Sequence, residues 1–564
     1  DLLLFDPSET WKKTKMKAGT YTVREMMQPI FINGECVYTS PSVKEIAAYC
    51  RQEKDTLWDE SKRLFNPHQM YIDLSPRLYE VKKQLLDRMS TGGLYPKAWV
   101  RKEVLPMKNM TLKNITAACH GTFHGDSNFL EKEITGVAID SRKAAPGFLF
   151  VPLKGARVDG HTFIPQVMEQ GALATLTEED PSSLTCPCIH VESCEKALRD
   201  IAAFYRMQLD IKVVGITGSV GKTSTKETIA SVLSRKYNVL KTEGNFNNGI
   251  GLPLTIFNLT EEHEVAVLEM GIDHFGEMHE LASISQPDIC VITNIGLAHM
   301  ENLGSRDGIL KAKTEVFDHL RPNASVILNG DDDKLSTVAE VQGKKPVFFG
   351  LSDQLDAYAD GIVSQGLRGT DAVLHLPLGE INVHIPVPGN HMVYNALAGA
   401  CVGMKLGLTL EEIQTGISSL KTIAGRTNLI DTGSLLIIDD CYNANPVSMK
   451  SSLDVLSTAT GRTVAVMGDM YELGDKENEL HYNTGAHAAE IGIDVICCIG
   501  ELSHHAYEGA KACAKSSAVL YFKTKQDFLG KIRNVVKKDD TILVKASHGM
   551  EFPEIIDVLR QMKF

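Results

Sequence analysis

Long apolar runs are missing from this chain of 564 residues. No stretch approaches the ~18 consecutive apolar residues that a membrane-spanning helix needs, and no secretory signal is visible. Positive charge is also scarce, since 58 Lys and Arg stand against 71 Asp and Glu, a formal net charge of −13. Nucleic acids and anionic membrane surfaces attract basic proteins. We therefore expect no nucleic-acid partner and no membrane insertion.

Regularly spaced cysteines are also missing, although the chain has twelve of them. Most lie in apolar runs, as Cys290, Cys401 and Cys497 do, which is typical of reduced, buried thiols in a cytoplasmic protein. One cluster comprises Cys186, Cys188, His190 and Cys194. It lacks the paired C-x-x-C spacing of zinc sites, so the sequence argues against zinc there.

The length predicts three or four domains of about 150 residues each. Changes in pattern divide the chain into an N-terminal extension (1–106), a second domain (107–207), a central domain (208–427) and a C-terminal domain (428–564). Strands and helices alternate in the last three, which predicts an α/β fold. We expect a monomer.

The clearest motif is VVGITGSVGKTSTKETIASVL, residues 213–233. It predicts a buried strand, a glycine turn and a helix whose first N–H groups and dipole favour phosphate. Lys222 is expected to reach the outer phosphates, and the Thr223 hydroxyl to hold Mg²⁺. The strict G-x-x-x-x-G-K-[ST] pattern is not met, because isoleucine stands at its first glycine. The predicted phosphate loop comprises Gly218, Ser219, Val220, Gly221, Lys222, Thr223 and Ser224.

Polar residues follow the next predicted strands of the central domain. Asn247 and Asn248 can bind phosphate oxygens or metal-bound water, or simply form a turn. Glu269 ends a buried strand and His299 lies just beyond another. Because the carboxyl ends of parallel strands face the ligand crevice, Glu269 is a candidate Mg²⁺ ligand. Lys313 falls on the following predicted helix, where a solvated position is the simpler interpretation.

The second domain is predicted to contain two strands around a Pro146-Gly147 turn, then a polar loop and a helix. Its polar residues together suit a nucleotide-sugar diphosphate, because Arg and Lys neutralise phosphate while hydroxyls bind sugar. They are Ser141, Arg142, Lys154, Asp159 and His161, and Gly160 lies in the same loop.

Alternating strands and helices in the C-terminal domain predict a Rossmann-like parallel sheet. Strands are expected near Leu435–Asp439, Thr463–Met467, Val495–Ile499, Ala518–Phe522 and Thr541–Val544. The domain lacks G-x-G-x-x-G, which weakens a dinucleotide interpretation. Three strand-end loops, DDCYNANP, GDMYELGD and KASHGME, hold polar clusters.

The N-terminal extension has no phosphate loop. IFINGECVY predicts a hairpin with an Asn33-Gly34 turn, Ser42 caps a predicted helix, another lies near Tyr79–Met89, and STGGLYP is a predicted linker. TYTVREMMQPIFINGECVYTSPSV, DTLWDESKRLFNPHQMYIDLS and TWKKTKMKAG resemble the C-terminal end of bacterial nicotinate phosphoribosyltransferases. Since the catalytic barrel of that enzyme is missing, we expect no transferase activity.

From about residue 107 onward, the chain closely resembles the Mur ligase family of peptidoglycan synthesis. The motifs are TGSVGKTSTK, GNFNNGIGLPL, LEMGID, NIGLAHMENLGS, AKTEVF, GNHMVYNALA, GRT, DDCYNANP and GDMYELG. The resemblance implies three α/β domains: a UDP-sugar-binding domain, a central P-loop ATPase domain and a Rossmann-like ligase domain, here preceded by a small α+β extension. DCYNANP and GDMYELG favour the member that adds D-alanyl-D-alanine to UDP-N-acetylmuramoyl-tripeptide.

The resemblance also implies roles for residues of the central domain. Lys222 and Thr223 would bind the ATP phosphates and a first Mg²⁺, which Glu269 shares. His299 would bind a second Mg²⁺. Lys313 matches the lysine that is carbamylated in the family, and a carbamate turns this cation into an anionic metal ligand.

Further roles carry over by motif. Asn395 would contact the adenine, Arg426 the γ-phosphate and Asp440 the ribose. The incoming dipeptide would meet Asn443, Asn445, Lys545 and Ser547. The UDP-sugar would meet Ser141, Arg142, Lys154, Asp159 and His161. One departure is the final loop, which usually resembles KGSR in the family but here reads KASH, residues 545–548. The arginine is replaced by His548, which weakens an anion contact because His is usually neutral at pH 7.

The implied chemistry is ATP-driven amide formation through an acyl phosphate. An alternative is another ligase of the superfamily, such as folylpolyglutamate synthase; Thr223 and the N-terminal UDP-type domain argue against it. A non-catalytic nucleotide-binding scaffold would predict loss of Lys222, Glu269, His299 or Lys313, and all four are present. A bifunctional transferase is disfavoured by the short N-terminal extension.

Overall fold

The computed structural model describes residues 106–155, 158–422 and 424–564, and before them only the backbone of four short strands. These strands are β1 (Ile30–Ile32), β2 (Glu35–Tyr38), β3 (Trp58–Asp59) and β4 (Leu64–Phe65). Antiparallel pairing of β1 with β2 confirms the predicted hairpin strands. The Asn33-Gly34 turn, both predicted helices and the STGGLYP linker lie outside the described residues. The chain forms two compact units, Asp1–Leu105 and Pro106–Phe564, and the three larger sheets belong to the second.

The first sheet of this second unit has five strands in the order β5-β9-β8-β7-β6. They are β5 (Thr122–His124), β6 (Gly136–Ala138), β7 (Phe148–Phe150), β8 (Ala174–Thr177) and β9 (Cys188–His190). The two strands predicted around Pro146-Gly147 are β6 and β7, but they run parallel rather than as a hairpin. The reason is the 3₁₀ turn η4 (Ser141–Lys143), capped by the Asp140 side chain, which lies between them. The predicted polar loop and helix are η5 (Gly160–Phe163) and α6 (Ile164–Glu169).

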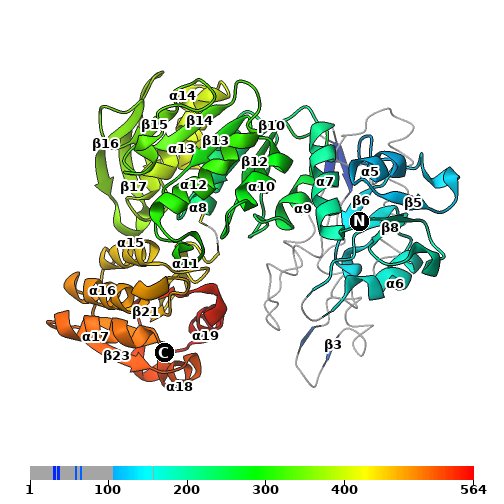
Figure 1. Cartoon of the computed structure of the whole chain (residues 1–564). Coiled ribbons are helices and arrows are strands. Elements are labelled where there is room, and N and C mark those ends of the chain that lie inside the picture. Colours follow the sequence, from blue (N-terminus) through cyan, green and yellow to red (C-terminus); the bar gives the residue numbers. More distant parts are fainter. Residues whose placement is uncertain are drawn as a thin grey trace. The chain divides into compact units, whose positions relative to one another are not determined.

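Helix α7 (Cys194–Met207) joins this domain to the central one. Its buried residues Leu198, Ile201 and Tyr205 share one apolar cluster with α9 (Gly251–Ile256) and α10 (Glu277–Ser285), and Figure 1 shows α7 beside α9. The Tyr205 hydroxyl donates a hydrogen bond of 2.7 Å to the carbonyl oxygen of Leu259. The two domains therefore have a common core.

The central sheet has nine strands in the order β11-β12-β10-β13-β14-β15-β16-β17-β18. They are β10 (Lys212–Thr217), β11 (Val239–Lys241), β12 (Val265–Glu269), β13 (Ile289–Ile292), β14 (Ser325–Asn329), β15 (Val347–Gly350), β16 (Ala357–Ser364), β17 (Thr370–Leu376) and β18 (Gly379–Ile385). Pairing is parallel from β11 to β16 and antiparallel at β16–β17 and β17–β18.

Helices cover both faces of this sheet. One face packs against α8 (Lys222–Leu233), α13 (Met392–Lys405) and α14 (Leu410–Ser418). The other packs against α9, α10 and α12 (Arg306–Thr314). Burial on both faces explains why the parallel strands read as continuous apolar runs. It leaves only their ends for polar chemistry.

The C-terminal sheet has six strands in the order β19-β20-β24-β21-β22-β23. They are β19 (Asn428–Asp431), β20 (Leu436–Asp439), β21 (Thr463–Gly468), β22 (Val495–Ile499), β23 (Ala518–Phe522) and β24 (Thr541–Lys545). All five predicted strands are confirmed, and they are parallel. The sequence pattern did not predict β19, which adds an antiparallel edge to β20.

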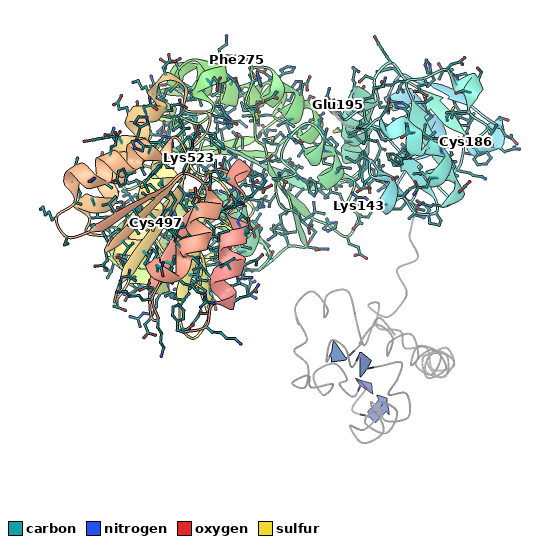
Figure 2. All side chains as sticks on the ribbon, turned by 90° about the horizontal axis from the view of Figure 1, so that it is seen from below. Lys143, Cys186, Glu195, Phe275, Cys497 and Lys523 are labelled. Carbon is teal, nitrogen blue, oxygen red and sulfur yellow. The ribbon has the colours of Figure 1, made fainter. Side chains whose placement is uncertain are left out.

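Five helices cover this sheet and complete a three-layer domain. One face packs against α15 (Pro446–Ser457), α16 (Glu477–Glu490) and α17 (Ser503–Cys513), the other against α18 (Lys525–Val535) and α19 (Pro553–Gln561). Cys497 lies on β22 inside the domain (Figure 2), and burial raises the pKa of its thiol to about 12. Cys290 and Cys401 are buried free thiols too, as expected. Among the described residues no helix combines the length and apolarity needed to cross a bilayer.

Candidate active site

A cavity of about 630 Å³ lies where the carboxyl ends of the central strands meet loops of the C-terminal domain. Most of the predicted central and C-terminal site residues line it: Ser219, Val220, Gly221, Lys222, Thr223, Ser224, Asn247, Asn248, Glu269, His299, Asn395, Arg426, Asp440, Asn443, Asn445 and Lys545. Gly218, Lys313, Ser547 and the predicted residues of the second domain (107–207) are not in its lining. The structure thus brings together residues that are more than 300 positions apart in the sequence.

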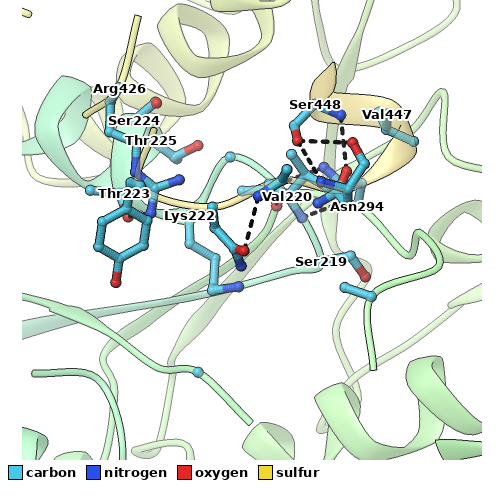
Figure 3. A pocket seen from close by; sticks show the side chains of 18 of the residues that line it. Ser219, Val220, Lys222, Thr223, Ser224, Thr225, Asn294, Arg426, Val447 and Ser448 are labelled. Carbon is cyan, nitrogen blue, oxygen red and sulfur yellow. Dashed lines mark hydrogen bonds between the residues drawn. The ribbon is translucent and has the colours of Figure 1, made fainter. Parts of the chain in front are cut away.

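The phosphate loop is shaped by the residues that follow β13. The Val220 N–H donates to Asn294 Oδ1 at 3.0 Å, a bond drawn in Figure 3, and the Thr293 hydroxyl donates to the Val220 carbonyl at 2.7 Å. Gly218 has φ of +145°, and a Cβ there would lie 1.9 Å from Thr293 Oγ1. Only glycine therefore fits at this turn. Neither partner was predicted from the sequence, although a Thr-Asn pair directly after a buried strand is the same kind of signal that marks Glu269.

Lys222 opens α8 at the edge of the cavity. Its Nζ donates to the Gly218 carbonyl at 2.8 Å, so the side chain folds back over the loop. Burial lowers its pKa, the nearby Arg426 acts in the same direction, and Glu269 opposes them. A cation held in such a partly desolvated loop interacts strongly with an anion that enters it.

Glu269 ends β12 and is paired in register with Ile216 of the neighbouring β10. Its side chain is almost fully buried, at 2% exposed. Oε1 accepts a hydrogen bond of 2.9 Å from Asn247 Nδ2, whereas Oε2 has no hydrogen-bond partner within the described part of the chain and lies 3.9 Å from Lys226 Nζ. Buried carboxylate oxygens normally have partners, so this donor set fits a hard cation such as Mg²⁺.

Lys313 is the most isolated cation beside the site. It lies on α12, is 1% exposed, and its Nζ has no hydrogen-bond partner among residues that the structure describes. Burial, and then the positive charge of Lys222, lower its pKa well below the usual lysine range. A buried lysine without a partner loses its proton readily, and the free amine is nucleophilic. The expectation of a solvated helix face is therefore wrong for Lys313.

His299 occupies a left-handed backbone conformation, with φ of +60°, directly before α11 (Met300–Leu303). Its Nδ1 lies 3.0 Å from Glu472 Oε2 of the C-terminal domain. Burial and the charge of Lys222 lower the pKa of the imidazole, against the opposing effect of Glu472. The neutral imidazole that results is the form that binds metal ions.

Two further predicted residues connect the phosphate loop with its surroundings. Arg426 Nη2 donates to the Thr223 hydroxyl at 3.2 Å, and its guanidinium lies 4.0 Å from the centre of the Tyr442 ring. On the central domain, Asn395 Oδ1 accepts a bond of 2.9 Å from the Thr225 hydroxyl. Figure 3 shows Arg426 next to the start of α8. Tyr442 was not predicted from the sequence, because its contact depends on how the two domains meet.

Asp440 and Lys545 form a buried pair at the cavity wall. Lys545 Nζ lies 2.6 Å from Asp440 Oδ2 and donates to the Asn443 carbonyl at 3.0 Å. Asp440 also accepts bonds from the Ser452 hydroxyl and the Thr427 N–H. These contacts fix the loop after β20 to the end of β24.

Removing one member of this pair should destabilise the domain. In Asp440→Asn the Lys545 ammonium stays buried without its counter-charge, and we expect the free energy of unfolding to fall by about 3–5 kcal/mol. Urea unfolding followed by circular dichroism measures this. Glu501→Gln, which removes the exposed partner of Lys523, is the control. A shift in the unfolding midpoint no larger than that of the control would refute the pair's structural role.

Two other predicted residues of the C-terminal domain have local structural contacts. Asn445 Oδ1 accepts the Ser448 N–H at 2.9 Å and caps α15. The Ser547 hydroxyl accepts the Tyr471 N–H at 2.9 Å. Tyr471 itself lines the cavity. Ser547 therefore acts on the cavity wall through a neighbour.

The predicted residues of the second domain (107–207) make their contacts within that domain. Lys154 pairs with Glu178 at 2.8 Å, and His161 Nδ1 lies 2.7 Å from Asp159 Oδ1 while its Nε2 accepts the Glu178 N–H at 3.1 Å. The other two are Ser141 and Arg142 on η4. Arg142 binds the Asp140 carboxylate with two nitrogens and lowers its pKa to about 2, but remains 84% exposed.

Comparisons with known proteins assign successive parts of the chain to the same family. Family models match at residues 133–206 (Mur ligase family, catalytic domain), 216–403 (Mur ligase middle domain) and 425–548 (Mur ligase, glutamate ligase domain). A fourth matches residues 1–82 (nicotinate phosphoribosyltransferase C-terminal domain), so both resemblances seen in the sequence are confirmed.

Individual relatives match this chain over nearly the whole of their own length. The UDP-N-acetylmuramoyl-tripeptide–D-alanyl-D-alanine ligase of Bacillus subtilis is 39% identical over 80% of this chain and 98% of its own. The crystal structure of MurF from Acinetobacter baumannii matches with a TM-score of 0.75 and 33% identity, over 81% of this chain and 100% of its own. MurF from Thermotoga maritima, solved in complex with ADP, matches with a TM-score of 0.67 and 30% identity. The match covers 76% of this chain and 97% of the Thermotoga chain.

Proposed function

This chain belongs to the Mur ligase family, and we propose that it joins D-alanyl-D-alanine to UDP-N-acetylmuramoyl-tripeptide in an ATP-dependent amide ligation of peptidoglycan precursor synthesis. Relatives that carry this activity in their names match it over almost their full length. We place the reaction in the cytoplasm and assign it to a monomer.

The single observation that carries the proposal is the composition of the cavity. It combines a phosphate loop with the buried carboxylate of Glu269, one oxygen of which has no hydrogen-bond partner among the described residues. Side chains of the C-terminal domain close the cavity. Nucleotide binding alone would need only the phosphate loop. The buried carboxylate and the closure by another domain suit a reaction of charged groups from which water must be excluded.

The nucleotide would lie along the loop and α8. Lys222 and the loop N–H groups would bind its phosphates, Asn395 the adenine and Asp440 the ribose. Arg426, already at Thr223, would reach the γ-phosphate. Asp440 has three protein partners, so a ribose hydroxyl would share its carboxylate with them.

We assign two Mg²⁺ ions to the remaining donors. Thr223 and the free oxygen of Glu269 would hold one, and His299 with carbamylated Lys313 the other. When bound, Mg²⁺ neutralises charge on the phosphoryl group being transferred. The depressed pKa of Lys313 supports the carbamate, because a neutral amine can add to CO₂ with loss of a proton.

The other substrates would occupy the adjoining domains. Lys154 and the exposed guanidinium of Arg142 would bind the UDP-sugar together with Ser141 and Asp159. His161, whose two ring nitrogens already bond Asp159 and Glu178, would position this loop. In the C-terminal domain the dipeptide would meet Asn443, Asn445 and Lys545, while Ser547 would act indirectly by holding Tyr471 in the cavity wall. Asn247 and Asn248 would orient the phosphate and metal side of the site.

The proposed reaction has two balanced steps. The terminal carboxylate of the tripeptide attacks the γ-phosphorus of ATP, which forms an acyl phosphate and releases ADP. The amine of D-alanyl-D-alanine attacks the acyl carbon, which forms the amide and releases phosphate and a proton. Lys222 and Arg426 stabilise the charge that develops on the phosphoryl oxygens.

Phosphate release from Mg²⁺-ATP tests the proposal. We expect release only when UDP-N-acetylmuramoyl-tripeptide and D-alanyl-D-alanine are both present, with the pentapeptide product seen by mass spectrometry. Equal release without the dipeptide would overturn the assignment of the acceptor. A folded protein with no turnover would favour the scaffold interpretation.

A further inference from the structure

Two histidines meet on the surface of the central domain, and neither belongs to the cavity lining. His279 lies on α10 and His319 ends the 3₁₀ helix η7 (Glu315–His319). Their Nε2 atoms are 3.1 Å apart, and the ring centroids are 4.4 Å apart with the planes inclined at 70°. Neither residue has a part in the proposed ligase reaction.

We propose that His279 and His319 form a two-histidine binding site for a divalent transition-metal ion such as Zn²⁺, Ni²⁺ or Cu²⁺. Bonds of about 2.0–2.1 Å between metal and imidazole nitrogen, in tetrahedral or octahedral geometry, place two nitrogens on one ion roughly 2.9–3.4 Å apart. The observed separation of 3.1 Å falls inside this range. Both ligand atoms can therefore bind one ion without rearrangement of the backbone.

The carboxylate of Asp318 supports this geometry from behind. Its Oδ2 lies 2.8 Å from Nδ1 of His279. An Nδ1–H that donates to Asp318 leaves the lone pair on Nε2, which faces His319. Metal-binding histidines typically have such a carboxylate partner, since it fixes the tautomer and the ring orientation.

The two elements are also held together without a metal. The Glu315 carboxylate of η7 accepts the N–H of Gly276, just before α10, at 3.0 Å. Because the ligands are preorganised, little ordering is required on binding.

An ion at this site would crosslink α10 to η7, the 3₁₀ helix that directly follows α12. Lys313 lies on α12, so the crosslink would stabilise the elements behind the proposed catalytic lysine by mass action. The ligand type selects the metal: imidazoles suit Zn²⁺, Cu²⁺ and Ni²⁺, whereas Mg²⁺ prefers oxygen. Mg²⁺ at the catalytic site and a transition metal here would not compete.

Calorimetric titration of the full chain with Ni²⁺, in excess Mg²⁺ to occupy oxygen-rich sites, tests the proposal. We expect one equivalent of binding that is lost in His279→Gln and in His319→Gln, and weakened about 10- to 100-fold in Asp318→Asn. The control, His504→Gln, changes an exposed histidine of the C-terminal domain and should bind as the unaltered chain does. All variants should retain the basal ligase activity and the metal-free melting temperature.

Anomalous diffraction from crystals soaked in Ni²⁺ provides a direct readout. A peak about 2 Å from both Nε2 atoms would support the site. The proposal is overturned if His319→Gln binds Ni²⁺ as the unaltered chain does, or if no anomalous peak lies between the two rings. In that case the short Nε2 separation is only a hydrogen bond between neutral imidazoles.

Discussion

Lys222→Ala is expected to abolish dipeptide-dependent phosphate release, with kcat/KM lowered about 10³-fold or more. Lys222 is the charged residue at the start of α8, and it already folds over the loop carbonyl of Gly218. Its partial burial lowers its pKa, and a bound phosphate would favour the cationic form and interact with its charge at short range. Its removal would leave Arg426 and the loop N–H groups as the phosphate ligands.

Steady-state kinetics with ATP varied measures this effect. The matched control is Lys236→Ala, a lysine just beyond the same helix that bonds the Gly407 carbonyl away from the cavity. It should retain activity within about twofold, because surface changes away from a site have small effects. More than a tenth of the original activity in Lys222→Ala would contradict the assignment.

Lys313→Ala should have an effect of similar size for a different reason. The proposed ligand is the carbamate on Lys313, so the variant would lose anionic oxygens next to His299 rather than a cation. We expect a decrease of about 10²–10³-fold in kcat, partly restored by a small carboxylate such as formate that can enter the vacated space. Depletion of CO₂ should lower the activity of the unaltered protein, and added bicarbonate should restore it.

Lys311→Ala is the control, because it removes an exposed lysine from the same helix two residues earlier. Labelled bicarbonate and ¹³C NMR would report the carbamate directly, with a signal that disappears in Lys313→Ala and persists in Lys311→Ala. Full activity in Lys313→Ala, or indifference of the unaltered protein to CO₂, would refute the carbamate.

Several parts of the site were predictable because they follow buried strands. Glu269, His299 and the phosphate loop all come where an apolar run stops, and the carboxyl ends of parallel strands converge at one edge of the sheet. Periodicity likewise predicted all five parallel strands of the C-terminal sheet, since strands buried on both faces leave unbroken apolar runs.

Other features depend on contacts that periodicity cannot reveal. The parallel pairing of β6 and β7 is set by the Asp140-capped turn between them. β19 pairs with β20 at a sheet edge, where few buried residues mark a strand. Tyr442 and Glu472 reach Arg426 and His299 only because two domains meet. For Lys313, a lysine on a helix normally indicates solvent, and only the packed structure shows its burial.

The core that α7 shares with α9 and α10 limits how this protein can evolve. One apolar cluster contains residues from both sides of that junction. Exchange of residues 106–207 for those of a distant relative would therefore replace a large part of a single packed core. The C-terminal domain, whose clusters are formed almost wholly by its own residues, can be recombined more freely. If the proposed sites are correct, we expect new nucleotide-sugar preferences to arise through substitutions at exposed positions such as Arg142 on η4, and new acceptor preferences through exchange of the whole C-terminal domain.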